Sequence, residues 1–153
     1  MKLAEALILR ADAWKRVLQL RERLNRVARV QEGETPAEAP LELLAEHDRA
    51  LAEFTTLVKR INRTNSVTAM DAGRSLTDAL ADRDAIAHER ATLHNLIANA
   101  NGGSSFRLTR TELRFVATVD VAELQKRADD LARRHRELDT TIQALNWTVD
   151  LLD

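Results

Sequence analysis

The chain has 153 residues, the size of one ordinary domain that buries a single hydrophobic core. Aromatic residues make up only 3% of it, and 4 Gly and 2 Pro are too few for a β-sandwich or barrel, so we expect a mainly α-helical fold. A formal net charge of −1 gives no overall attraction to nucleic acid or anionic lipid. The absence of cysteine excludes disulfides, thiolate nucleophiles and Cys-ligated zinc.

The first residues, MKLAEALILRADAWKR, mix charged side chains at Glu5, Arg10 and Asp12 into an apolar pattern. That mixture is typical of an amphipathic helix rather than of a signal peptide. No apolar run reaches the 18 residues or so that a membrane-spanning helix needs. We therefore expect a cytoplasmic protein that does not enter the membrane.

Four long helices are predicted, and the first two occupy about 2–25 and about 36–64. In the first, apolar residues recur every three or four positions, which places them on one helix face. Between the two helices, EGETPAEAP interrupts the pattern. Thr35 precedes Pro36 and is followed three residues later by Glu38, which is an N-cap signature and predicts that the second helix begins there.

The third helix is predicted over about 76–100, because Ser75 is followed three residues later by an aspartate that completes a capping box. The last helix is predicted over about 121–152, after Asp120 as its N-cap. Its apolar residues alternate steps of three and four from Val121 onward, which is coiled-coil spacing. So long a regular stripe favours packing against a second chain, and we expect a homo-oligomer.

A small two-stranded β ribbon is also predicted. The stretch TELRFVATVD, residues 111–120, alternates apolar and polar side chains, as a strand with one buried face does. Because a lone strand is not stable, we expect it to pair with RVARV, Arg26–Val30, which alternates in the same way.

The two parts of the chain resemble each other, so we expect one helical domain, 1–153, made of two similar halves at about 1–73 and 74–153. Two alignments carry this prediction. The first pairs residues near the start of each half: Leu3/Leu76, Glu5/Asp78, Ala6/Ala79, Leu7/Leu80, Arg10/Arg83, Leu20/Leu93 and Leu24/Ile97. The second pairs residues of the second and last helices: Leu44/Ala128, Phe54/Leu138, Val58/Ile142, Ile61/Leu145, Asn62/Asn146 and Thr64/Thr148.

Charge is unevenly distributed along the chain. Residues 1–31 carry eight Lys/Arg against three acids, whereas residues 32–56 carry seven acids against Arg49 alone. We expect the first helix to lie against the second, with opposite charges paired. The alternative is that basic residues of the first helix form a nucleic-acid-binding face. Its members would be Arg16, Arg23, Arg26 and Arg29. The overall charge disfavours this alternative.

Polar residues recur at matching places near the ends of two helices: Asn62 and Thr64 in the second, and Asn146 and Thr148 in the last. Asn and Thr are mediocre helix formers, but near a helix end their side chains can satisfy free carbonyls. We interpret all four as structural polar residues, with the two amides bonded to carbonyls or to each other.

Arg10 and Arg83 lie at matching positions on apolar helix faces, where a guanidinium needs a partner. One interpretation is an ion pair with a nearby carboxylate of Glu5, Asp78 or Asp84. The alternative is that they converge on a small anionic ligand. That ligand-binding group would comprise Arg10, Arg63, Asn65, Arg74 and Arg83.

No pattern of catalytic residues, metal ligands or phosphate-binding glycines is present. A di-iron bundle would need Glu-x-x-His pairs, and the four histidines do not form them. We therefore predict no metal and no cofactor, and the sequence disfavours an enzyme. The remaining hypotheses are a self-associating helical binding or scaffold protein, an anion-binding protein or small enzyme at the Asn/Thr/Arg-rich helix ends, and a nucleic-acid-binding protein.

Several strings are specific enough to compare with known families: MKLAEALILRAD, VQEGE, KRINRTNS, GRSLTDALADRD, FVATVDVAELQK and LNWTVDLL. On these strings the chain resembles, nearly from end to end, a family of small uncharacterised bacterial proteins often labelled septicolysin. The resemblance implies a helical protein of unknown function.

Overall fold

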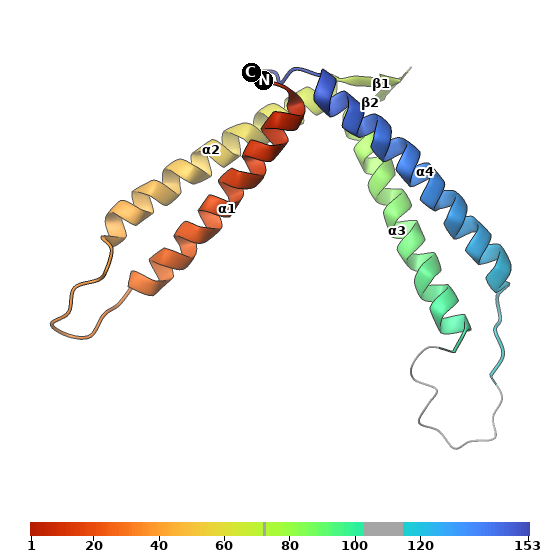
Figure 1. Cartoon of the computed structure of the whole chain (residues 1–153), viewed down its shortest axis with the longest axis horizontal. Helices are drawn as coiled ribbons and strands as arrows, with labels where there is room; N and C mark the ends of the chain where they lie inside the picture. Colours follow the sequence, from red (N-terminus) through yellow and green to blue (C-terminus); the bar gives the residue numbers. More distant parts are fainter. Residues whose placement is uncertain (72, 103–114) are drawn as a thin grey trace. The chain divides into compact units, whose positions relative to one another are not determined.

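The computed structural model describes residues 1–71, 73–102 and 115–153. Its main elements are four long helices, shown in Figure 1: α1 (Leu3–Val27), α2 (Pro40–Val67), α3 (Leu76–Ala100) and α4 (Val121–Thr148). Two short strands, β1 (Ala69–Asp71) and β2 (Arg74–Ser75), pair between α2 and α3. The predicted fold class, mainly helical with a small two-stranded ribbon, is confirmed.

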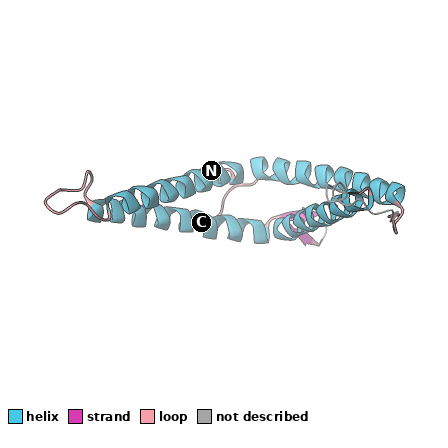
Figure 2. Ribbon diagram, turned by 90° about the horizontal axis from the view of Figure 1, so that it is seen from below, coloured by secondary structure: helices cyan, strands magenta, loops and turns pink. Residues whose placement is uncertain are grey.

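The chain divides into two compact units, one of Met1–Ala69 with Ala144–Asp153 and one of Met70–Gln143. In the first unit α1 and α2 lie side by side as the first hairpin, and in the second α3 and most of α4 form the second hairpin. Figure 2 shows how small the strands are beside the helices. None of the described helices is both long enough and apolar enough to cross a bilayer.

The core of the first hairpin comes from one face of each helix. Its buried residues are Val17, Leu20, Val27, Leu43 and Ala50, with Leu24 packed against them. On α1 these residues recur every three or four positions, so that they form one stripe facing α2. The predicted facing of the first and second helices is confirmed.

The second hairpin has a smaller core. Leu93 of α3 is buried with Ala128 and Leu131 of α4, and Ile86 and Leu124 pack against this cluster. The coiled-coil spacing of α4 supplies the face that packs against α3.

The predicted helix starts are correct for the second hairpin. The hydroxyl of Ser75 accepts a hydrogen bond from the Asp78 backbone N–H at 3.2 Å, and the Asp78 carboxylate accepts one from the Ser75 N–H at 3.0 Å. Asp120 accepts a hydrogen bond from the backbone N–H of Glu123 at 3.0 Å. Side-chain capping therefore fixes where α3 and α4 begin.

The predicted start of α2 and the predicted end of α4 are wrong. α2 begins at Pro40 with Ala39 as its N-cap, four residues after the predicted start. Either proline could occupy the first helical turn; with the start at Pro40, Glu38 lies in the bend before the helix and pairs with Arg23 of α1. α4 ends at Thr148 rather than near residue 152, because Val149–Leu151 instead bonds to the first residues of the chain.

The β ribbon is not where the sequence predicted it. Arg26 and Val27 belong to α1, and Ala28–Val30 forms no strand. Of the second predicted strand, residues 111–114 lie outside the described residues, and 115–120 forms no strand. The ribbon is instead β1–β2, which turns at Gly73 with φ of +97°, a conformation that glycine adopts without strain.

A second, shorter pairing joins the two ends of the chain. The Leu3 N–H donates to the Val149 carbonyl at 2.9 Å, and the Leu151 N–H donates to the Met1 carbonyl at 2.9 Å. Lys2 and Asp150 form the antiparallel bridge between them and an ion pair of 2.9 Å. α1 is thus entered from an extended pair, as α3 is entered from β2.

Candidate interaction surface

The first hairpin has two different sides, and one of them is charged. On this side Arg16 of α1 forms an ion pair with Glu46 of α2 at 2.7 Å. Arg23 donates two hydrogen bonds to the carboxylate of Glu38 just before α2. This hydrogen bonding lowers the pKa of Glu38 and raises that of Arg23. The opposite charges of the two helices therefore pair within the chain, as the sequence predicted.

The other side of the first hairpin is apolar and exposed. The rings of Trp14 and Phe54 meet there with centroids 5.0 Å apart, although 43% of Trp14 remains exposed. Along α2, Leu44 and Leu51 are 45% and 39% exposed. We call this surface the apolar side. Helical spacing places on it, from α1 and α2, Leu7, Ala11, Trp14, Leu18, Leu44, Leu51, Phe54 and Val58.

Of the predicted ligand-binding residues, Arg83 has partners within its own hairpin. Its guanidinium bonds to Asp84 at 3.0 Å and to Asp139 of α4 at 3.4 Å. The ion-pair interpretation is therefore confirmed for Arg83 through Asp84. Arg10, at the matching position of α1, is half-buried, and none of the described residues forms a hydrogen bond or ion pair with it.

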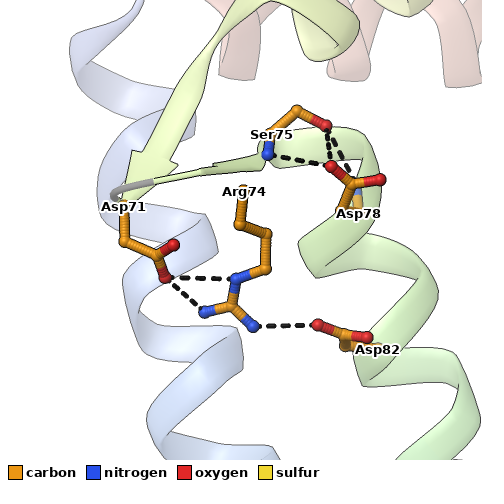
Figure 3. Close-up of polar contacts among 5 residues, drawn as sticks. All are labelled: Asp71, Arg74, Ser75, Asp78 and Asp82. Carbon is orange, nitrogen blue, oxygen red and sulfur yellow. Dashed lines mark hydrogen bonds and ion pairs between the residues drawn. The ribbon is translucent and has the colours of Figure 1, made fainter.

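Arg74 is also held by carboxylates, as Figure 3 shows. It bonds to Asp71 of β1 at 2.6 Å and to Asp82 of α3 at 2.9 Å, which raises the pKa of the guanidinium. Arg74 thus ties the ribbon to the first turns of α3. An anionic ligand at Arg74 or Arg83 would compete with these carboxylates.

Arg63 lies in the first unit, near the end of α2. It donates to the backbone carbonyl of Asp153, while Arg60 donates to the Asp153 carboxylate at 2.8 Å. Asn65 is half-buried in the same turn. Arg63 and Asn65 belong to one unit, and Arg74 and Arg83 to the other. A common anionic ligand for these residues stays a prediction.

The four predicted structural polar residues have different surroundings. Thr64 is buried, donates to the Arg60 carbonyl at 2.9 Å and accepts from the Leu152 N–H at 3.0 Å. Thr148 is exposed and donates to the Ala144 carbonyl at 3.2 Å. Asn146 is only 6% exposed, whereas Asn62 is exposed. Thr64 therefore fastens the C-terminal segment to α2.

The second hairpin carries an open groove of about 700 Å³ between α3, α4 and the ribbon. Its walls mix apolar residues such as Ile86 and Leu138 with the charged residues Glu89, Arg134 and Glu137. Within the described ranges, no three His, Asp or Glu side chains are grouped to hold a metal ion. Thr141, the hydroxyl residue among the described residues that line the groove, donates a hydrogen bond to the Glu137 backbone carbonyl at 3.0 Å.

Sequence analysis missed the apolar side. A signal was present, because the apolar residues of the first helix fall into two stripes and only one is needed for the core. The apolar spacing was interpreted as one face of the first helix, and the second stripe was not assigned a role. The Trp14–Phe54 contact separates them, since it shows that the second stripes of α1 and α2 adjoin.

Comparison with known proteins identifies a family and a similar solved structure, but neither has a known function. The model of a family of unknown function, DUF6847, matches residues 10–151. A similar solved structure is the crystal structure of a functionally unknown conserved protein from Corynebacterium diphtheriae, with 43% identity, a TM-score of 0.93 and 99% of each chain covered. No curated protein matches the chain. Neither match supports the name septicolysin.

Proposed function

The chain belongs to the DUF6847 family, whose function is unknown, and we propose that it is a non-enzymatic helical scaffold or binding protein of the cytoplasm that associates with itself. The observation that carries this proposal is the exposed apolar side of the first hairpin, centred on Trp14 and Phe54. Soluble domains rarely expose a large continuous apolar patch unless it binds something.

Association through this side is favourable for a simple reason. Each Å² of apolar surface removed from water contributes about 25 cal/mol, and aromatic residues at the centre of an interface contribute most. Trp14 is already held by Phe54, so it loses little side-chain freedom when a second surface covers it. A preformed aromatic anchor supports a binding role better than isolated exposed leucines would.

Other surfaces support association less well. On the charged side of the first hairpin, Arg16 and Arg23 already have carboxylate partners in the chain. On the second hairpin, Arg127 pairs with Glu89 and Arg133 with Asp130. Exposed pairs of this kind contribute little to affinity.

The test compares two variants of similar exposed apolar residues by sedimentation velocity. Trp14→Ser removes the anchor of the apolar side, and Leu96→Ser, at a residue 40% exposed on α3, is the matched control. We expect the first variant to dissociate at concentrations where the wild type and the control remain assembled. If the wild type and both variants assemble equally, the proposal that the chain associates through the apolar side is wrong.

Fluorescence supplies a second readout, because the chain has only two tryptophans, Trp14 and Trp147. In a Trp147→Phe background, emission reports Trp14 alone. Dilution of the assembled protein should shift this emission to the red as Trp14 becomes hydrated. Emission that does not change across the dissociation range would contradict burial of Trp14 in the interface.

A further inference from the structure

One row of side chains runs along the apolar side of α1. Arg10, Trp14, Leu18 and Glu22 follow one another at intervals of four residues, so that they form one of the ridges along which helices pack. Trp14 and Glu22 are exposed, and Arg10 and Leu18 are half-buried. The row therefore has an aromatic and an aliphatic residue in the middle and one charge at each end.

Neither end charge is paired within the described part of the chain. The side chains of Arg10 and Glu22 form no ion pair or hydrogen bond there. Arg83, which matches Arg10, has Asp84 and Asp139, but the two alignments place Ala11 and Thr55 at the corresponding positions of the first hairpin. The first hairpin thus has an arginine at this position, Arg10, but no carboxylates at the positions that match Asp84 and Asp139.

A partner that covers the apolar side must provide a group that pairs with the charge of Arg10. A guanidinium stays protonated and has only donors, so an apolar partner would leave Arg10 buried and unpaired at high cost. A carboxylate on the occupant would bind it in a forked arrangement. The same reasoning requires a cation for Glu22 if the occupant reaches that far along α1.

A second copy of the chain satisfies both requirements. Trp14 and Leu18 each lie two residues from position 16, and Arg10 and Glu22 each lie six residues from it. A twofold axis that passes through the row at position 16 places the row antiparallel to the same row of the second copy. Trp14 then contacts Leu18 of the second copy. Arg10 then meets Glu22 of the second copy, and the reciprocal pair forms at the other end.

We infer that two copies of this chain pack through α1, antiparallel, with the row Arg10–Trp14–Leu18–Glu22 lying against itself. This inference rests on the proposed function and specifies the surface and its register. Helices that pack through ridges of this type have axes that cross at about −50°, the commonest angle between packed helices. The two reciprocal ion pairs fix the register, and the central Trp14 and Leu18 supply most of the buried apolar area.

Charge reversal tests the register. In an Arg10→Glu homodimer each introduced carboxylate would face Glu22 of the other copy, and in a Glu22→Arg homodimer each introduced guanidinium would face Arg10. We expect each variant alone to dimerise at least tenfold more weakly than the wild type. In an equal mixture, one chain has two acids and the other two arginines, so that both contacts of the heterodimer are attractive.

Native mass spectrometry of the mixture, with one variant carrying a short tag, measures heterodimer directly. We expect it to restore the wild-type affinity, and the double variant Arg10→Glu/Glu22→Arg should do the same. Melting curves followed by circular dichroism check that each variant is folded, and Arg10→Met, which removes the charge without repulsion, should weaken the dimer less than Arg10→Glu.

The outcomes separate this inference from the proposed function. If the single variants dimerise as the wild type does, or if the mixture restores nothing, the register is wrong while self-association stands. If only another protein, and not a second copy, protects Trp14, the occupant is wrong. If the wild type does not self-associate, the proposed function fails and the inference fails with it.

Discussion

Each hairpin is built from two long helices, but the two hairpins use their apolar residues differently. In the first, Val17 lies within a continuous core, and further apolar residues cover a second side. In the second, Arg90 occupies the position that matches Val17, and its Nε is buried without a partner among the described residues. The second hairpin has a thinner core and charged surfaces, whereas the first has more apolar surface than its own core uses.

This difference teaches that one apolar stripe of α1 is buried within the hairpin while a separate stripe stays exposed, and we propose the exposed stripe for association between chains. A helix needs one apolar stripe to pack against its neighbour, and a second stripe is explained only by a second contact. α1 has both stripes. The matched arginines differ in the same way, because Arg83 has carboxylate partners within its hairpin and Arg10 has none among the described residues.

Making the first hairpin resemble the second should have the largest effect. Val17→Arg would place a guanidinium in the core cluster that contains Leu20 and Leu43, where the described core residues are all apolar. An unpaired buried charge costs about 3–5 kcal/mol, and we expect a loss of this size in urea unfolding. A loss below about 1 kcal/mol would mean that this core is as open as that of the second hairpin.

The reverse exchange should stabilise the protein. Arg90→Leu replaces a side chain whose Nε is buried and unpaired among the described residues, and places an apolar residue between Ile86 and Leu93 of the α3 core stripe. Removing an unsatisfied buried donor should raise the free energy of unfolding by about 1–2 kcal/mol. A destabilised variant would show that Arg90 contributes a favourable contact to this hairpin.

The N-terminal caps of α1 and α3 also differ, and we expect a smaller effect on stability from this difference. α3 starts with a side-chain cap from Ser75, whereas α1 starts after Lys2, and Glu5 only accepts from the Lys2 backbone N–H at 2.6 Å. Ser75→Ala should cost about 1 kcal/mol and increase hydrogen exchange at the first amides of α3. Unchanged exchange there would show that Asp78 alone holds the turn.

The smallest expected effect is on the acid side of the stability curve. The pKa values of Glu38, Asp78 and Asp150 are lowered mainly by side-chain hydrogen bonds from Arg23, Ser75 and Lys2. A carboxyl group with a lower pKa in the folded state binds fewer protons than it does unfolded. Its stabilising contribution is therefore complete above its unfolded pKa of about 4 and is lost as the pH falls through the folded pKa.

Urea unfolding between about pH 6 and pH 3 measures this contribution. Glu38→Gln in the first hairpin and Asp78→Asn in the second should each flatten the loss of stability with acid. Glu42→Gln, which removes an exposed carboxylate of α2 that has no ion pair among the described residues, is the control. A curve for Glu38→Gln that falls as steeply as the wild type would contradict the role of the Arg23 contact.

Much of the fold followed from local signals. Capping residues fixed the starts of α3 and α4 because their side chains bond to backbone groups only three residues away. At the start of α2, local reasoning failed. Thr35–Pro36 resembles a helix start, but α2 begins at Pro40, and Glu38 before it pairs with Arg23 of α1, a contact that no local pattern shows.

The ribbon and the apolar side could not be derived in this way. Alternation in RVARV resembles a strand, but Val27 is needed to continue the core stripe of α1, so the helix extends through it. β1 and β2 are too short to show any alternation. The partners of Arg74 and Arg83 depend on helix register, which the sequence specifies only after the helices are paired.

Sedimentation equilibrium of the unmodified chain over a wide concentration range tests the central claim most directly. We predict a particle mass above 17.2 kDa that approaches twice this value as concentration rises, in keeping with a twofold contact through α1. A mass that stays at 17.2 kDa at every concentration would contradict self-association and leave the exposed Trp14 without an explanation.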